Sequence, residues 1–183
     1  MSTTDRRVRR THDALRAALL ELILEHGFEA TTVLQITERA NVGRSTFYAH
    51  YADKEDLLQG SIEGLRAWLE EHMDADADQR QTEVHPALAF CLPMLEHAAD
   101  SKPLFAAMIG RRGGQLLVEL THDMWAALVR ARWPGADEIG VQAIAGAFGS
   151  TLAWWLTSAP HLTAAEVDAR FRALFEPIIR ARP

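Results

Sequence analysis

Cysteine is almost absent from this sequence of 183 residues, and the single Cys91 has no zinc-ligand spacing around it. An internal disulfide is therefore excluded, which argues against a small disulfide-held scaffold and favours a reducing, cytoplasmic compartment. Proline is scarce, at 7 residues, and we find no internal repeat or low-complexity tract. Because 48% of the residues are hydrophobic and 24% are charged, the composition predicts a folded globular protein.

An excess of positive charge is also lacking. The 19 Lys and Arg residues face 25 Asp and Glu, and the net charge of −6 argues against binding nucleic acid over the whole surface. The charge is unevenly distributed, however, because four arginines lie together in the run Arg6-Arg7-Val8-Arg9-Arg10. This run indicates a basic arm or the start of a helix, with a solubility tail as the alternative.

The chain lacks the signature of a secretory or transit peptide, because Asp13, Glu21 and Glu25 interrupt the apolar residues that follow the arginines. From Ile139 to Pro160, however, no residue is charged. This stretch fits either a membrane span or a buried interface helix. Its polar residues and acidic N-terminal flank favour the interface helix, so we expect no membrane partner.

Strand alternation is missing, whereas apolar residues recur at helical spacing through most of the chain. We expect an all-α protein of about nine helices, with an N-terminal three-helix helix-turn-helix domain and a C-terminal helical bundle. Residues 74–81 lose the apolar rhythm and are predicted to form a domain linker or an inter-helix loop. The expected helices cover residues 13–26, 33 to about 41, 44–51, 53 onward, 85–99 with a kink at Pro93, 103–109, 115–132, 137–158 and 164–180.

Local signals mark several helix ends. Thr32 with Gln35, and Thr163 with Glu166, have the spacing of capping boxes. Gly27 follows the first helix where a C-terminal cap is expected. These signals predict where individual helices begin and end.

The turn Asn41-Val42-Gly43 joins two short helices into a helix-turn-helix, with Asn41 in the left-handed conformation and Gly43 as the next N-cap. The second of these helices has the size of one that enters a DNA major groove. It carries polar and aromatic donors on one face, while Phe47 and Tyr51 face inward. The candidate DNA contacts on and after this helix are Arg44, Ser45, Thr46, Tyr48, His50 and Lys54.

A family resemblance rests on residues spread over several elements. They are Gly27-Phe28-Glu29-Ala30-Thr31-Thr32-Val33, Ile36, Glu38-Arg39-Ala40, Thr46-Phe47-Tyr48-Ala49-His50-Tyr51 and Asp53-Lys54-Glu55-Asp56-Leu57-Leu58. In the first third of the chain they closely resemble the DNA-binding domain of TetR-family transcriptional regulators. The resemblance implies that Thr32, Tyr48 and Lys54 hold phosphates, and that Arg44, Ser45, Thr46 and His50 face or border the bases.

Two departures from the family pattern concern the turn and the second helix. Asn41 stands where the family usually has glycine and Gly43 where it usually has a capping serine, so the turn is kept with the roles exchanged. Leu34 occupies a position that is often basic or polar. It contacts a thymine methyl or is simply an exposed leucine, and we favour the second interpretation.

The resemblance implies a DNA-binding domain in residues 1–55 and a ligand-binding and dimerisation domain in residues 56–183. A lone helix-turn-helix reads few bases, so a homodimer on an inverted-repeat operator is also expected on physical grounds. The candidate dimer-interface residues are Gly146, Gly149, Ser150, Ala153, Trp154, Phe171 and Phe175; packing within the subunit's own core is the alternative. The candidate ligand-binding residues are Phe90, Phe105, Met108, Trp125 and Phe148, for which ordinary core packing is the default.

The glycine-rich segment 110–114, which contains Arg111 and Arg112, is either an anion site or, as we favour, a surface turn. No histidine pair has zinc-ligand spacing, and no nucleophile motif is present, so we expect no catalysis, metal or cofactor. The function expected is a transcriptional repressor released from a double-stranded DNA operator by a small molecule, with activation left open. The alternatives are a metal-sensing regulator and a helical ligand-binding protein that does not bind DNA.

Overall fold

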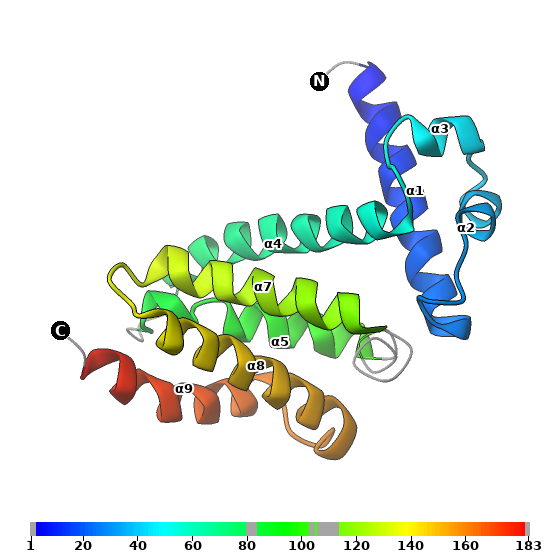
Figure 1. The fold of residues 1–183 in the computed structure, drawn as a ribbon. Coiled ribbons are helices and arrows are strands. Elements are labelled where there is room, and N and C mark those ends of the chain that lie inside the picture. Colours follow the sequence, from blue (N-terminus) through cyan, green and yellow to red (C-terminus); the bar gives the residue numbers. More distant parts are fainter. Residues whose placement is uncertain (1–2, 80–83, 103–104, 106–113, 182–183) are drawn as a thin grey trace. The chain divides into compact units, whose positions relative to one another are not determined.

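The computed structural model describes residues 3–79, 84–102, 105 and 114–181, and all regular elements in these ranges are helical (Figure 1). The all-α class is thereby confirmed. The elements are α1 (Thr3–His26), α2 (Val33–Arg39), α3 (Arg44–Tyr48), α4 (Lys54–Gln79), the 3-10 helix η1 (Pro86–Leu88), α5 (Cys91–Asp100), α7 (Gly114–Arg132), α8 (Glu138–Ser158) and α9 (Ala164–Arg180). The predicted helix 103–109, with Met108, and the segment 110–113 lie outside the described residues, apart from Phe105.

The chain divides into two compact units. One contains Met1–Glu63 with Ala107–Val118, and the other contains Gly64–Ala106 with Glu119–Pro183. The division falls inside α4, which begins in the first unit and continues in the second. The domain boundary predicted between residues 55 and 56 stays a prediction.

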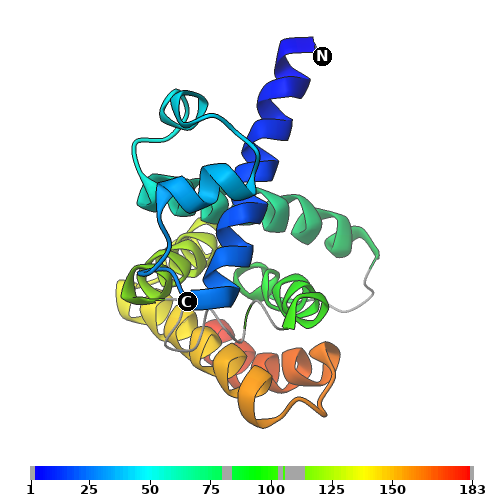
Figure 2. The same cartoon turned by 90° about the vertical axis from the view of Figure 1, so that its right-hand side faces the viewer.

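Helices α1, α2 and α3 and the start of α4 make up the N-terminal part of the first unit (Figure 2), and they enclose a buried apolar core. Both predicted backbone features of the turn are confirmed: Asn41 is left-handed with φ 52°, and Gly43 is the N-cap of α3. The capping box of Thr32 and Gln35 begins α2, as expected. The buried residues of this core are Leu15, Leu19, Ile23, Phe28, Ile36, Phe47, Tyr51, Leu57 and Leu58.

Helix α3 is shorter than predicted, because it ends at Tyr48 rather than at Tyr51. The N–H groups of His50 and Tyr51 both donate to the Phe47 carbonyl, at 2.9 Å each, which closes the last turn. The next N–H, that of Ala52, donates to Asp56 Oδ2 at 2.8 Å instead of continuing the helix. The Asp56 carboxylate in the first turn of α4 thus takes an N–H group that could have extended α3. The apolar periodicity of residues 44–51 does not reveal this alternative acceptor.

The predicted loop at 74–81 is wrong for residues 74–79, because α4 continues to Gln79. The apolar rhythm reports which residues are buried, whereas the helix also depends on backbone preference, which is favourable for Ala75, Ala77 and Gln79. Residues 80 and 81 lie outside the described part of the chain.

The continuous helix predicted for 85–99 is also wrong. The chain forms η1, leaves it at Ala89, and begins α5 at Cys91 with Phe90 as its N-cap. Pro93 is therefore the third residue of α5 and causes no kink. Its missing N–H removes no bond, because the first four N–H groups of a helix have no intrahelical acceptor.

Phe148 on α8 is the centre of the second unit's core. Its ring centroid lies 4.8 Å from Phe90, 5.3 Å from Trp125 and 5.6 Å from Phe171. The neighbouring Cys91 is fully buried, and burial raises the pKa of its thiol. The N-cap of α5 and the helices α7, α8 and α9 thus meet at the Phe148 side chain.

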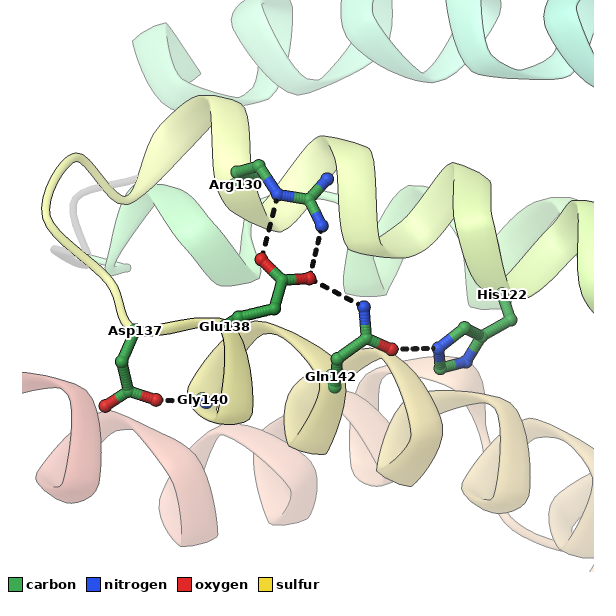
Figure 3. A network of polar contacts seen from close by, with 6 residues as sticks. All are labelled: His122, Arg130, Asp137, Glu138, Gly140 and Gln142. Atoms are coloured by element: carbon green, nitrogen blue, oxygen red, sulfur yellow. Dashed lines mark hydrogen bonds and ion pairs between the residues drawn. The ribbon is translucent and has the colours of Figure 1, made fainter.

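A polar network joins α7 to α8 at the surface of the second unit (Figure 3). Arg130 donates to both carboxylate oxygens of Glu138, at 3.2 and 2.6 Å, and Gln142 Nε2 donates to Glu138 Oε1 at 2.8 Å. Gln142 Oε1 lies 2.6 Å from His122 Nε2, so this nitrogen carries the proton. The network fixes the register of two long helices.

Helix α8 is long and apolar enough to cross a membrane by length and composition, and it alone passes that test among the described residues. Its side chains divide by face. Phe148 and Trp155 are buried in the second unit, and the Trp155 indole donates to the Leu162 carbonyl at 2.9 Å, whereas Trp154 is exposed. The helix therefore combines a face buried within the unit with an exposed apolar one.

Candidate nucleic-acid interface

The short helix α3 presents the polar face that the sequence predicts. Arg44, Ser45, Thr46 and Tyr48 are all exposed, while Phe47 is completely buried and anchors the helix. The Tyr48 ring packs edge-on against Phe47, with a centroid distance of 5.3 Å, and 53% of the tyrosine remains exposed. The helix is thus held from one side and leaves hydrogen-bonding groups on the other.

His50 follows α3 and is packed against α1 by an aromatic contact. The His12 ring lies 4.7 Å from the His50 ring, and His12 Nδ1 lies 2.9 Å from the Tyr51 hydroxyl. Burial lowers the pKa of His12, and the positive charges of His50 and Arg16 lower it further, against a smaller opposing effect of Asp13. A neutral His12 therefore holds the end of the candidate recognition helix.

Arg16 adds a second tie from α1. Its Nη2 donates to the Gly60 carbonyl on α4 at 2.8 Å. Burial raises the pKa of Tyr51, and the charge and hydrogen bond of Arg16 oppose that shift. Sequence reasoning did not identify His12 or Arg16. The available signal is their spacing, because together with Leu19 and Ile23 they follow the inward stripe of α1.

Thr32, a candidate phosphate contact, is exposed and uses its side chain in the cap of α2. Its hydroxyl donates to Gln35 Oε1 at 3.0 Å and accepts from Gln35 N at 3.3 Å. The neighbouring Leu34 is 48% exposed, as both of its interpretations require, so the choice between them stays a prediction.

Lys54, the other candidate on α4, is half-buried and bound within its own unit. Its Nζ donates to the carbonyls of Phe28 and Glu29, at 2.9 and 3.1 Å, and lies 4.6 Å from the centroid of the Phe28 ring. Lys54 therefore ties the loop before α2 to the first turn of α4, a role that the sequence does not indicate.

Arg39 at the end of α2 is held by α1. It contacts Glu21 at 3.2 Å and Glu25 at 2.8 Å, and its hydrogen bonds lower the pKa of Glu25. These exposed ion pairs connect α1 to α2. Arg39 is therefore bound within the protein, as Arg16 and Lys54 are.

The candidate ligand-binding residues fall into two aromatic groups of the second unit. Phe90, Trp125 and Phe148 pack together, and all three are buried. Phe105 is buried in a different group, 5.6 Å from His97, which in turn lies 4.9 Å from Trp68. The buried Trp125 Nε1 has no hydrogen-bond partner among the described residues.

The candidate dimer residues differ in exposure. Ser150 and Trp154 are exposed, whereas Gly146, Ala153 and Phe175 are half-buried. Phe171 is buried and stacks on Phe175 at 4.6 Å, and Gly149 packs beneath Trp125 of the same chain. The exposed apolar face of α8 and α9 also includes Leu174 and Ile178, which the sequence analysis did not select.

Comparison with known proteins finds relatives for the N-terminal part of the chain. Residues 15–60 match the family model of bacterial regulatory proteins of the tetR family. The uncharacterized HTH-type transcriptional regulator YxbF of Bacillus subtilis is 37% identical over 97 residues, which are 51% of this chain and 26% of that protein. The chain spans about a quarter of the length of the curated relatives it matches.

Solved structures share the fold over most of the chain. A TetR transcriptional regulator from Streptococcus agalactiae has a TM-score of 0.68 at 23% identity, covering 94% of this chain and 97% of its own. The regulator FadR from Bacillus subtilis, in complex with stearoyl-CoA, has a TM-score of 0.65 at 18% identity, covering 88% and 96%.

The buried anchor, the left-handed turn and the exposed polar face of α3 define a helix-turn-helix. Over residues 15–60 the chain is thus similar to bacterial regulatory proteins of the tetR family.

Proposed function

We propose that this protein is a DNA-binding transcriptional regulator, a repressor that a small-molecule ligand releases from its operator. The observation that carries the proposal is the exposed polar face of α3, held from beneath by the buried Phe47. A helix with only a structural role has no need of Arg44, Ser45, Thr46 and Tyr48 side by side in solvent.

In this proposal the residues around α3 divide into two roles. Arg44, Ser45, Thr46 and His50 face or border the bases, where arginine reads guanine through two parallel hydrogen bonds. Tyr48, Thr32 and Lys54 hold phosphates and so set the register on the duplex. Tyr48 and Thr32 are exposed, whereas Lys54 is half-buried.

The regulator acts as a homodimer, because two half-sites of an inverted repeat supply the specificity that a single short helix lacks. The proposed interface combines the apolar faces of α8 and α9. Its support is the exposure of large apolar side chains there, since Trp154 is 50%, Leu174 67% and Ile178 57% exposed.

The effector is an apolar molecule with a hydrogen-bond acceptor, bound near Phe90, Trp125 and Phe148. The unpartnered Trp125 Nε1 supports this assignment, because a buried indole N–H without an acceptor costs free energy that a ligand oxygen would recover. A fold relative, the FadR of Bacillus subtilis, is in complex with stearoyl-CoA, which joins an apolar acyl chain through a thioester carbonyl to the charged coenzyme A. Ligand binding favours a conformation that no longer fits the half-site spacing.

The proposal places the regulator in the cytoplasm, without enzymatic activity and without a membrane partner. A metal-sensing regulator is the alternative with the least support, because no three His, Cys, Asp or Glu residues group together in the described part of the chain. A metal titration of the apo-protein separates it from a sensor of organic ligands.

Selection of bound duplexes from a randomised pool tests the function directly. The recovered duplex and a random one are then titrated at two salt concentrations. We expect an inverted repeat that the protein binds more tightly than random DNA. Failure to enrich any sequence, with binding no tighter than charge alone explains, would favour a helical ligand-binding protein instead.

A further inference from the structure

Some of the basic residues in the N-terminal part of the chain are already bound within the protein. Residues 1–60 contain eight basic residues, and three of them are bound internally. Arg39 pairs with two glutamates of α1, Arg16 donates to the Gly60 carbonyl, and Lys54 donates to two carbonyls of the loop before α2. The remaining five are Arg44 on α3 and the four arginines of the run 6–10.

The run 6–10 lies in the first turns of α1 as regular, exposed helix. None of its four arginines forms an ion pair or side-chain hydrogen bond with any residue that the structure describes. Both views show these turns extending beyond the rest of the unit, at the end where α3 lies (Figures 1 and 2). The run is therefore a cationic projection beside the candidate recognition helix.

The run works against the stability of its own helix. Arg6 stands three residues before Arg9 and four before Arg10, and Arg7 stands three before Arg10, so like charges neighbour one another on the helix surface. Cations near a helix N-terminus also oppose the helix dipole. A polyanion alongside these turns would remove both penalties.

We propose that the arginine run on α1 is a second phosphate-binding element, which holds the DNA backbone flanking the major groove that α3 enters. This inference rests on the proposed function and adds a contact that the helix-turn-helix residues do not supply. Three of the eight basic residues in residues 1–60 are already bound within the protein, and four of the other five belong to the run. The run therefore carries most of the positive charge that can still bind the phosphate backbone of DNA.

The orientation of α1 ranks the four arginines. The His12 ring contacts His50, which shows which face of α1 turns toward the end of α3. Arg9 precedes His12 by three residues and lies about 60° from it around the helix, whereas Arg7, five residues before, lies about 140° away. Arg9 is thus the strongest candidate contact, and Arg7 is a control of the same charge on the same helix.

The test uses the full chain with the selected duplex and a random duplex of equal length. Affinities of the wild type, Arg9→Gln, Arg7→Gln and the quadruple glutamine variant are measured by fluorescence anisotropy from 50 to 200 mM salt. We expect Arg9→Gln to weaken binding to both duplexes roughly tenfold at 100 mM salt and to reduce the salt slope by about 1 per protomer. Arg7→Gln leaves both values near wild type, and the quadruple variant loses more than Arg9→Gln.

Circular dichroism melting accompanies each titration, and we expect the quadruple variant to be as stable as the wild type or more so, because repulsion is removed. Specific binding to the selected duplex with an unchanged slope in the quadruple variant would overturn this inference and leave the proposed function standing. If the wild type selects no sequence, the proposed function fails and this inference fails with it.

Discussion

Gly149 of α8 lies so close beneath the Trp125 indole of α7 that a Cβ at position 149 would stand 2.7 Å from Trp125 Cζ3. Trp125 also packs against Phe148 and is buried, so its ring has little room to move. The glycine therefore serves the packing of two helices within one chain.

Gly149→Ala is expected to lower the free energy of unfolding by about 1–3 kcal/mol, because the added methyl displaces a packed indole. Gly146→Ala is the matched control on the same helix. Its Cβ would meet no atom nearer than His122 Cε1 at 3.9 Å, so alanine should be neutral or stabilise by about 0.5–1 kcal/mol. Urea unfolding of both variants tests the contrast, and equal effects would contradict it.

Lys54→Ala should have two separable effects. It removes the donor to the Phe28 and Glu29 carbonyls and the cation over the Phe28 ring, so we expect a loss of about 1–2 kcal/mol in stability. DNA binding should weaken on all sequences alike if Lys54 also reaches a phosphate. Denaturation and DNA titration measure the two effects, with Glu55→Ala as a neighbouring surface control. A variant of wild-type stability would contradict the tie between the loop and α4.

Tyr48→Phe and Arg44→Ala distinguish backbone contact from base reading. Tyr48→Phe removes one hydroxyl from an exposed ring, so it should weaken binding to specific and random duplexes equally. Arg44→Ala should relax preference at particular bases, at a cost of about 1–3 kcal/mol on the selected operator. Repeating the pool selection with each variant provides the measurement. Equal losses on both duplexes for Arg44→Ala would rule out its assignment to the bases.

Substitutions of the adjacent Trp154 and Trp155 should change different properties, dimer formation for Trp154 and stability for Trp155. Trp154→Glu places a charge on the exposed face and should yield a folded monomer. Trp155→Ala empties a buried site and removes the donor to the Leu162 carbonyl, which should cost about 3–5 kcal/mol in stability. Analytical ultracentrifugation and thermal melting separate the two results. Trp154→Glu remaining dimeric would exclude this face from the proposed interface.

His12 should make stability depend on pH. Because the folded state holds the pKa of His12 below its ordinary value of 6.5, the unfolded chain binds the proton first as pH falls below that value. The free energy of unfolding therefore decreases in acid below pH 6.5 and is unaffected by His12 above it. The charged neighbours are Asp13 and Arg16 on α1 and His50 beside α3.

His12→Gln keeps a hydrogen-bonding group near the Tyr51 hydroxyl but does not titrate in this range. Its stability should fall less than that of the wild type between pH 7 and pH 5, as measured by urea unfolding at each pH. Burial also lowers the pKa of His85 and His97, so part of the slope remains. An exposed substitution, His161→Gln, is the control, and an unchanged slope in His12→Gln would contradict the assignment.

Local features of the fold were predictable because they depend on neighbours in the sequence. The capping boxes at Thr32 and Thr163 and the left-handed Asn41 each follow from backbone geometry within a few residues. The composition of the face of α3 was readable for the same reason. The order of the helices, the bounds of α7, α8 and α9 to within one residue, and the all-α class therefore follow from the chain itself. The start of the first helix does not, because α1 begins at Thr3 rather than at the predicted residue 13.

Contacts between distant residues decided the rest. Tyr51 meets His12 across 39 positions, and Lys54 meets the Phe28 carbonyl across 26. No local pattern specifies either pair, because each depends on how whole helices pack. The same holds for the end of α3, which the first turn of α4 sets.

The adjacent Trp154 and Trp155 show most simply what the sequence determines and what tertiary packing decides. Sequence alone determined that residues 139–158 form an uncharged helical stretch with bulky and small side chains on all sides. Only tertiary packing decided that Trp155 is buried, that Trp154 is exposed, and that Gly149 makes room for Trp125. A uniformly apolar helix has no polar face to set its rotation, so its neighbours in space choose which side is buried.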